Sequence, residues 1–211
     1  MAGSDSEPSV HAGYMKNVAE AVRGALPEGP AIAARQPELF ARIDDAGPTR
    51  WLPVRTNVAM VEAVRTAIGP ERTHAFLSSY VFGQLDSPML RNLVEGGIRI
   101  LGLRPAALAR WVPNVYGTMF RHCGSWTVGP TTETSVGISV RDLPPELAGH
   151  TVWLESVASG MQVIFLLCRT RGDVALTSCD RQTGHARFEL RWPYEARPAA
   201  DDAATPTVRG S

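Results

Sequence analysis

The chain has 211 residues, of which 44% are hydrophobic and 20% are charged, the composition of an ordinary globular protein. Its 21 basic residues balance its 21 acidic residues, so no net charge draws it to nucleic acid or to an anionic membrane. The cysteines Cys123, Cys168 and Cys179 lack CxxC spacing, which argues against a disulfide framework or a structural zinc site and favours reduced thiols in a cytosol.

The two ends of the sequence differ in composition from its middle. Small residues, Pro and acidic residues dominate both ends, so we expect disorder over residues 1–12 and 194–211 and a single domain over residues 13–193. The N-terminus has neither the charged segment nor the apolar core of a secretory signal. The longest apolar run, residues 161–168, is too short to span a bilayer. We therefore expect a cytoplasmic protein without a membrane span.

Apolar residues at helical spacing run through the first half of the chain. The spacing predicts a helix over residues 14–26 and a shorter helix around Phe40. A further helix is expected to begin at Thr56, whose hydroxyl suits an N-cap, and to end at Gly69. Pro70 then fits the first turn of the next helix, where its missing N–H costs nothing.

Two more helical segments follow. The first, over residues 87–103, begins at a Ser-Pro pair and contains two adjacent glycines, which weaken a helix. The second, over residues 104–124, contains Pro113, which should kink it, and Gly124, which should end it. The first half of the chain is therefore expected to be helical up to Gly124.

The second half changes to the period-two alternation that is typical of β-strands. Strands are predicted over residues 125–130, 135–143, 173–178 and 185–192. Residues 150–169 instead show apolar steps of three and four, which predict a helix between the two strand pairs. N-terminal helices followed by a strand-strand-helix-strand-strand antiparallel sheet make the fold class α+β.

His122 and Cys123 form the densest pair of reactive side chains. A catalytic thiol needs a nearby base or a helix N-terminus that favours its thiolate. Adjacent helical residues point about 100° apart, and this pair lies at a predicted helix C-terminus, where the dipole disfavours an anion. We therefore expect His122 to cap the helix and Cys123 to pack as a small apolar residue. A cysteine-dependent enzyme is a minor alternative, and no catalytic residue or metal site is predicted.

The apolar side chains of the predicted helices allow two interpretations. Either they fill a core, or they enclose a cavity, since pockets for small molecules are largely apolar with a few polar groups. A cavity should lie between the helices of residues 76–120 and the helix of residues 151–168. Its residues, called the predicted wall below, are Leu108, Trp111, Val115, Met119, Met161 and Phe165.

Three segments, residues 103–126, 139–162 and 184–192, resemble a family of mostly uncharacterised myxobacterial proteins. That family is similar in turn to a ligand-binding superfamily of NO signalling and Golgi transport. The superfamily includes the haem–NO-binding domains, the vinyl-reductase-type domains and the small subunits of the transport-particle (TRAPP) complex. The resemblance extends over residues 50–193 and implies helices followed by an antiparallel sheet with a crossing helix, in agreement with the pattern above.

The resemblance also implies a small apolar ligand or a partner subunit, often in a homodimer. The haem-binding branch holds the haem propionates with a Tyr-x-Ser-x-Arg motif, which the nearest string here, SSYVFGQ at residues 78–84, lacks. We therefore expect no cofactor, with haem as a minor alternative. The predicted function is that of a non-catalytic sensory or assembly domain that binds a small hydrophobic ligand. The alternative is a homodimeric adaptor with a filled core.

Overall fold

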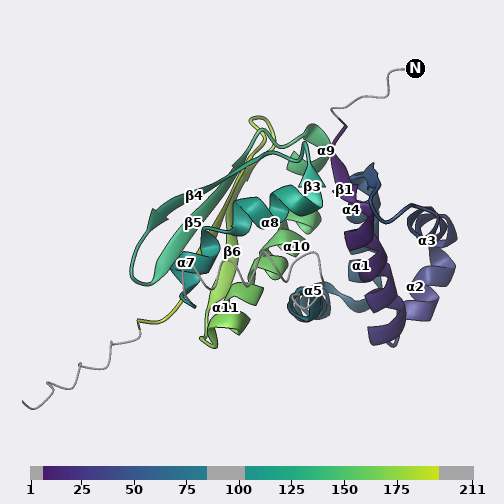
Figure 1. Ribbon diagram of the computed structural model, residues 1–211, viewed down its shortest axis with the longest axis horizontal. Coiled ribbons are helices and arrows are strands. Elements are labelled where there is room, and N and C mark those ends of the chain that lie inside the picture. The colour runs from purple at the N-terminus through teal and green to yellow at the C-terminus, as the bar shows by residue number, and fades with distance from the viewer. Residues whose placement is uncertain (1–6, 85–102, 195–211) are drawn as a thin grey trace, which may run out of the picture.

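The computed structural model describes residues 7–84 and 103–194, and Figure 1 shows helices packed beside and against a twisted antiparallel sheet. The helices are α1 (Ala12–Ala25), α2 (Gly29–Arg35), α3 (Pro37–Asp44), α4 (Arg55–Ile68), α5 (Pro70–Gln84), α7 (Pro105–Ala109), α8 (Val112–Met119), α9 (Pro145–Ala148), α10 (Thr151–Met161) and α11 (Val163–Cys168). The strands are β1 (Ser9–His11), β2 (Trp51–Pro53), β3 (Phe120–Arg121), β4 (Ser125–Thr131), β5 (Ser135–Arg141), β6 (Asp173–Asp180) and β7 (His185–Arg191). The predicted α+β class is confirmed.

The main sheet has four antiparallel strands in the order β4-β5-β7-β6. Its strands alternate as predicted, so that Ile138 on β5 pairs with Phe188 on β7 and both side chains are fully buried. Helices α7, α8 and α10 contact the strands on this inner face. On the other face Arg187 and Arg191 are exposed, and Figure 1 shows no described helix over it. The sheet is therefore covered on one side within the described residues.

A second, three-stranded sheet was not predicted from the sequence. Its middle strand β1 pairs with β2 and β3, and Val10 on β1 is completely buried opposite Leu52 and Phe120. The expectation of disorder through residue 12 was therefore wrong for the described part of the N-terminus, because burial of Val10 anchors the strand. Residues 1–6 and 195–211 lie outside the described residues.

Several predicted helix boundaries differ from the structure. Thr56 is not an N-cap: it lies inside α4, and its buried hydroxyl has no partner among the described residues. The helix predicted over residues 104–124 is broken into α7 and α8, with Pro113 in the first turn of α8, where a proline is tolerated. Its end comes at Met119, because Phe120 joins the second sheet. The helix predicted over residues 87–103 lies outside the described residues except for Leu103.

Helices α10 and α11 form the predicted helix between the strand pairs, interrupted at Gln162. By length and composition alone, the apolar stretch Thr151–Cys168, with mean hydropathy 1.5, would suffice to cross a membrane. The core helix of a soluble protein passes the same test. Trp153, Leu154 and Phe165 are buried against other elements of the fold, as such a core helix requires.

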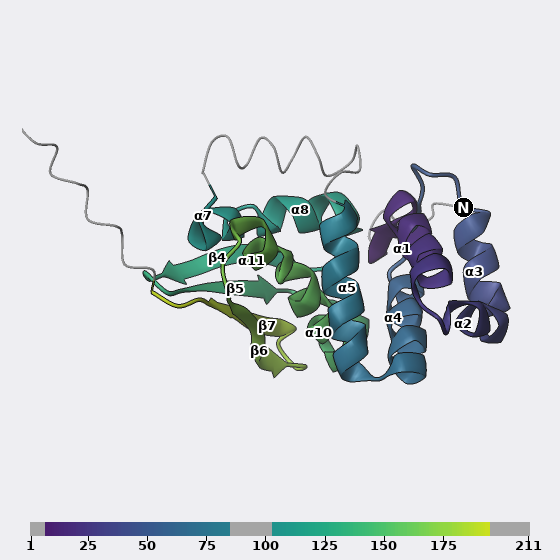
Figure 2. The same ribbon diagram turned by 90° about the horizontal axis from the view of Figure 1, so that it is seen from below.

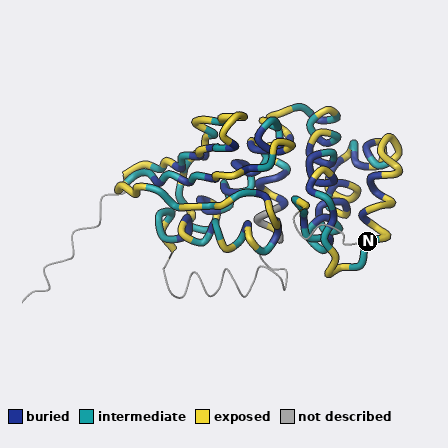
Figure 3. The backbone as a smooth tube through the Cα atoms, turned by 90° about the horizontal axis from the view of Figure 1, so that it is seen from above, coloured by how far each residue is buried: buried dark blue, intermediate teal, exposed yellow. Residues whose placement is uncertain are grey.

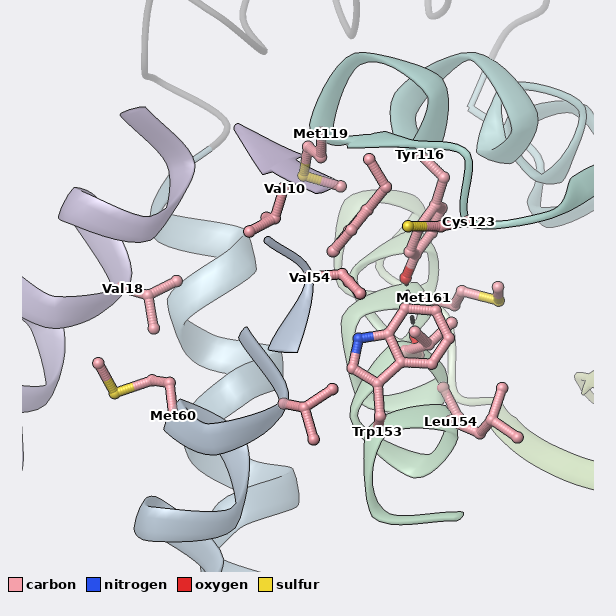
Figure 4. Close-up of a cluster of buried hydrophobic side chains, with 14 of the residues drawn as sticks. Val10, Val18, Val54, Met60, Tyr116, Met119, Cys123, Trp153, Leu154 and Met161 are labelled. Atoms are coloured by element: carbon pink, nitrogen blue, oxygen red, sulfur yellow. Dashed lines mark hydrogen bonds between the residues drawn. The ribbon is translucent and has the colours of Figure 1, made fainter. Parts of the chain in front are cut away.

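Trp153 links the N-terminal helices to the rest of the fold. Its side chain is 1% exposed, and its indole N–H donates a hydrogen bond of 2.9 Å to Asn57 Oδ1 on α4. The Asn57 amide in turn donates to Met15 Sδ on α1 at 3.4 Å. Figure 4 shows the Trp153 ring lying between α4 and the body of α10, with Tyr116 and Met161 beside it. The buried Trp153 indole and the buried Asn57 side chain therefore both have hydrogen-bond partners. These two hydrogen bonds join α1, α4 and α10.

We expect Trp153→Phe to lower the free energy of unfolding by about 2 to 4 kcal/mol, because it leaves Asn57 Oδ1 buried without a donor and opens a small void. Trp111→Phe is the matched control, since Trp111 is only partly buried and its substitution should cost less than about 1 kcal/mol. Urea unfolding of both variants measures the difference. Equal losses in the two variants would contradict the assigned role of Trp153.

Candidate ligand-binding site

A groove of about 470 Å³ lies between α4, α5, α10 and β6. Figure 2 shows α5 beside α4 on one side and α10 on the other, and β6 is the edge strand of the main sheet that contacts α10. The groove is therefore at the junction between the N-terminal helices and the sheet. Its volume falls within the range of small-molecule pockets.

The groove has apolar walls and a group of polar side chains. Its apolar residues are Val61, Pro70, Leu77, Val152, Ala158, Val174 and Leu176. Its polar residues are Arg65, Glu71, Thr73, His74, Glu155, Ser156 and Ser159. The groove thus combines an apolar surface with a few convergent polar groups, the usual composition of a ligand site.

His74 is held by a hydrogen-bonded serine at the groove. Its Nδ1 lies 2.7 Å from Ser159 Oγ, and Ser159 Oγ donates to the carbonyl oxygen of Glu155 at 2.9 Å. Ser78 Oγ donates to the Ser159 carbonyl oxygen at 2.9 Å, which further fixes α5 against α10. Ser159 is only 3% exposed, so its hydrogen bond with Nδ1 ties the His74 imidazole to the buried base of the groove.

The charged residues of the groove are not all paired. Arg65 forms an ion pair with Glu155 across α4 and α10. Glu71 is exposed in the first turn of α5 and has no ion-pair partner among the described residues. A carboxylate is favoured in that position because the helix dipole is positive there. The groove therefore carries an uncompensated negative charge one helical turn from His74.

The predicted wall lies away from this groove. Leu108 and Met119, from α7 and α8, and Met161 and Phe165, from α10 and α11, are buried in the common core. Trp111 and Val115 are partly exposed. None of these side chains lines the groove between α4, α5, α10 and β6. A pocket at the predicted wall therefore stays a prediction.

The sequence analysis missed the polar residues of the groove. Glu71 and His74 are three residues apart on α5, and Ser156 and Ser159 are three residues apart on α10. Such pairs share one helix face, so each is a local signal of a polar strip. Only the folded structure shows that the two strips lie on the same groove.

Cys123 is buried as expected, whereas His122 does not cap a helix. Helix α8 ends before β3, and His122 is exposed with a positive φ of 55°. Burial raises the pKa of the Cys123 thiol to about 12. Its sulfur lies 3.2 Å from the Arg121 carbonyl oxygen, a hydrogen-bond acceptor that offers a thiolate no stabilisation. The pair therefore lacks the environment of a cysteine nucleophile.

The comparisons with known proteins find similarity in structure alone. Neither family models nor curated protein sequences match the chain. An unliganded Fe(II) H-NOX protein from K. algicida is 9% identical, with a TM-score of 0.56, and the match covers 88% of this chain and 98% of that one. An oxygen-binding H-NOX domain related to soluble guanylate cyclases is 7% identical, with a TM-score of 0.58 and coverage of 89% and 98%.

A mutant H-NOX of T. tengcongensis is 6% identical, with a TM-score of 0.57 and coverage of 86% of this chain and 97% of that one. At sequence identities this low, the structural matches show a shared fold and nothing more specific. The resemblance to the haem–NO-binding branch is thus confirmed at the level of fold. The myxobacterial, vinyl-reductase-type and transport-particle parts of the resemblance stay predictions.

The histidines of this chain do not fit an interior haem site. All five are described, and none is among the core side chains. His11 lies edge-on to a tryptophan ring, and His74 and His150 contact other polar side chains. His122 is exposed, and His185 lies on the outer sheet face.

The aromatic packing around α8, β3, β4 and α10 also argues against an interior haem site. Tyr116 stacks on Trp126 with a centroid distance of 4.6 Å, and Phe120 meets the Trp153 ring edge-on at 5.9 Å. The Tyr116 hydroxyl donates to the Val157 carbonyl oxygen at 2.9 Å, so it is not a free ligand. These rings pack α8 against β4 and β3 against α10, and leave no space between the stacked faces of Tyr116 and Trp126.

We expect Cys123 in the folded protein to react with iodoacetamide at pH 8 at least about a hundredfold more slowly than in urea, because a pKa near 12 leaves little thiolate. Peptide mass spectrometry resolves the three cysteines, so Cys168 and Cys179 serve as internal comparisons. Alkylation of native Cys123 faster than that of the unfolded thiol would restore the enzyme hypothesis.

We also expect that haemin added to the purified protein forms no saturable complex, because no histidine is among the buried core residues. An absorption titration in the Soret region is the measurement. The opposite result would be a sharp band that saturates at one haem per chain and disappears in a single His→Ala variant. That result would require an interior different from the one described.

Proposed function

We propose that the chain is a non-catalytic sensory domain that binds a small, largely apolar molecule in the groove between α4, α5, α10 and β6. The observation that carries this proposal is the groove itself, with its apolar walls and clustered polar side chains. A continuous buried core from Val10 to Leu190 supports its action as a single domain. The absence of a disulfide between the three described cysteines is consistent with a cytoplasmic protein.

The Ser159–His74 pair does not turn the groove into a hydrolase site. A serine nucleophile must present its oxygen to substrate and give its proton to a base. Ser159 is buried and donates its hydroxyl hydrogen to the Glu155 carbonyl oxygen within its own helix. The serine is therefore a positioning contact, which supports binding over catalysis.

The predicted wall is the alternative location for the bound ligand. Its side chains come from α7, α8, α10 and α11, on the side of α10 that faces α7 and α8. A hydrophobic ligand there would need the buried side chains of Met119 and Met161 to separate. The groove needs no such rearrangement, so it is the favoured site.

The second candidate function is the homodimeric adaptor. Leu166 on α11 is 45% exposed, and Leu103, just before α7, is 52% exposed. Helices α7 and α11 contact each other, and Leu103 lies two residues before α7. Exposed apolar side chains in one region favour a protein contact. Under this hypothesis Leu166→Glu abolishes the dimer seen by light scattering.

Native mass spectrometry of the protein as purified, before and after unfolding, tests ligand binding. We expect a mass excess that disappears on unfolding. Ser156→Trp, which places an indole in the groove, should remove at least about nine-tenths of this excess because it fills the binding volume. Val115→Trp, at an equally half-buried helical position of the predicted wall, is the matched control and should keep the excess.

The reverse pattern, with ligand lost only in Val115→Trp, would place the ligand at the predicted wall and contradict the groove. A clean mass together with a stable dimer would favour the adaptor. Circular dichroism and thermal melting of both variants establish that each still folds.

A further inference from the structure

We propose that the groove is selective for small organic amines, with the ammonium group between Glu71 and His74 and the apolar body on the wall formed by α4, α10 and β6. This inference deepens the proposed function and rests on it. It names the chemical class of the ligand from the charge and hydrogen-bond pattern of the groove.

The contact with Ser159 determines which nitrogen of His74 carries the proton in this proposal. A serine hydroxyl has one hydrogen, and that of Ser159 is donated to the Glu155 carbonyl oxygen at 2.9 Å. With the hydroxyl hydrogen assigned in this way, Ser159 Oγ accepts from His74 Nδ1, 2.7 Å away, and the proposal rests on this tautomer. A neutral imidazole that carries its proton on Nδ1 has its lone pair on Nε2. His74 therefore offers the groove a hydrogen-bond acceptor.

Glu71 gives the groove a negative charge. Arg65 neutralises Glu155, which leaves Glu71 as the unpaired charge of the groove among the described residues. Residues three apart on a helix are surface neighbours, so Glu71 and His74 lie on the same face of α5, and both line the groove. Two acceptors, one of them negative, match an ammonium group, which has several donors and no acceptor.

The wall of the groove opposite α5 is apolar. Val61 on α4, Val152 on α10 and Val174 on β6 give that wall an aliphatic surface. An alkyl or aryl chain buried there gains hydrophobic free energy, whereas a second charge would lose its solvation. The ligand class is therefore an amine with one polar end and one apolar end.

Hexylamine, hexanol and hexanoate are matched probes, because they share a chain length and differ in the charge of the head group. We expect isothermal titration at pH 7.5 to show hexylamine bound at least about tenfold more tightly than hexanol, and hexanoate bound most weakly. Ser156→Trp should abolish binding of hexylamine, which locates the probe in the groove.

Glu71→Gln removes the charge and keeps the size of the side chain. We expect it to weaken hexylamine at least about tenfold while leaving hexanol unchanged within about twofold. Glu38→Gln is the matched control, since Glu38 is an exposed first-turn glutamate on α3 far from the groove. Ser159→Ala should weaken hexylamine less than Glu71→Gln, because it releases the His74 tautomer without removing a charge.

The outcomes separate the two proposals. If hexanol or hexanoate binds the groove as tightly as hexylamine, or if Glu71→Gln leaves hexylamine unchanged, the amine inference is wrong while ligand binding stands. If no probe binds and the purified protein releases no mass on unfolding, the proposed function itself has failed.

Discussion

The hydrogen bond between the Trp153 indole and Asn57 sets the position of α10, on which the other layers of the fold depend. An indole N–H buried this deeply must find an acceptor, and Asn57 Oδ1 on α4 supplies it at 2.9 Å. Helix α10 also contacts α5 and β6. The contact therefore fixes the N-terminal helices against the main sheet. In Figure 3 many of the buried residues lie in the helices around this junction, whereas exposed residues are frequent on the outer helices and along the strands.

The groove follows from the same placement of α10. One face of the helix carries Trp153 and Leu154 into the core, while Ser156 and Ser159 lie along the groove. The hydrogen bonds of Ser159 to α5 residues join the groove wall to a helix that is itself held by the core. A site built on packed helices keeps its polar groups in fixed positions, which lowers the entropic cost of binding.

The main sheet could be predicted because every second residue of β5 and β7 enters the core, as Ile138 and Phe188 illustrate. The strand β1 could not, because three residues are too few to show alternation and its partners come from distant segments. The groove was hidden for a related reason. His74 and Ser159 are 85 positions apart, and only the docking of α10 on α5 brings them together. Periodicity reports which face of an element is buried, but it does not report which partner buries it.

The structural similarity to H-NOX domains concerns the fold and does not extend to the side chains that would bind a ligand. A shared backbone arrangement leaves the ligand open, because ligands are recognised by particular side chains and unrelated functions recur on one fold. Here the stacked rings of Tyr116 and Trp126 occupy the space between α8 and β4, and Phe120 closes on Trp153. Among the described residues, a groove lies between α4, α5, α10 and β6, and it is lined by His74 and by Glu71, which has no ion-pair partner there. Aromatic packing stabilises the interior, whereas the charged side chains lie at the junction of α5 and α10. Under the proposed function, these side chains select the ligand, and the shared fold only positions them.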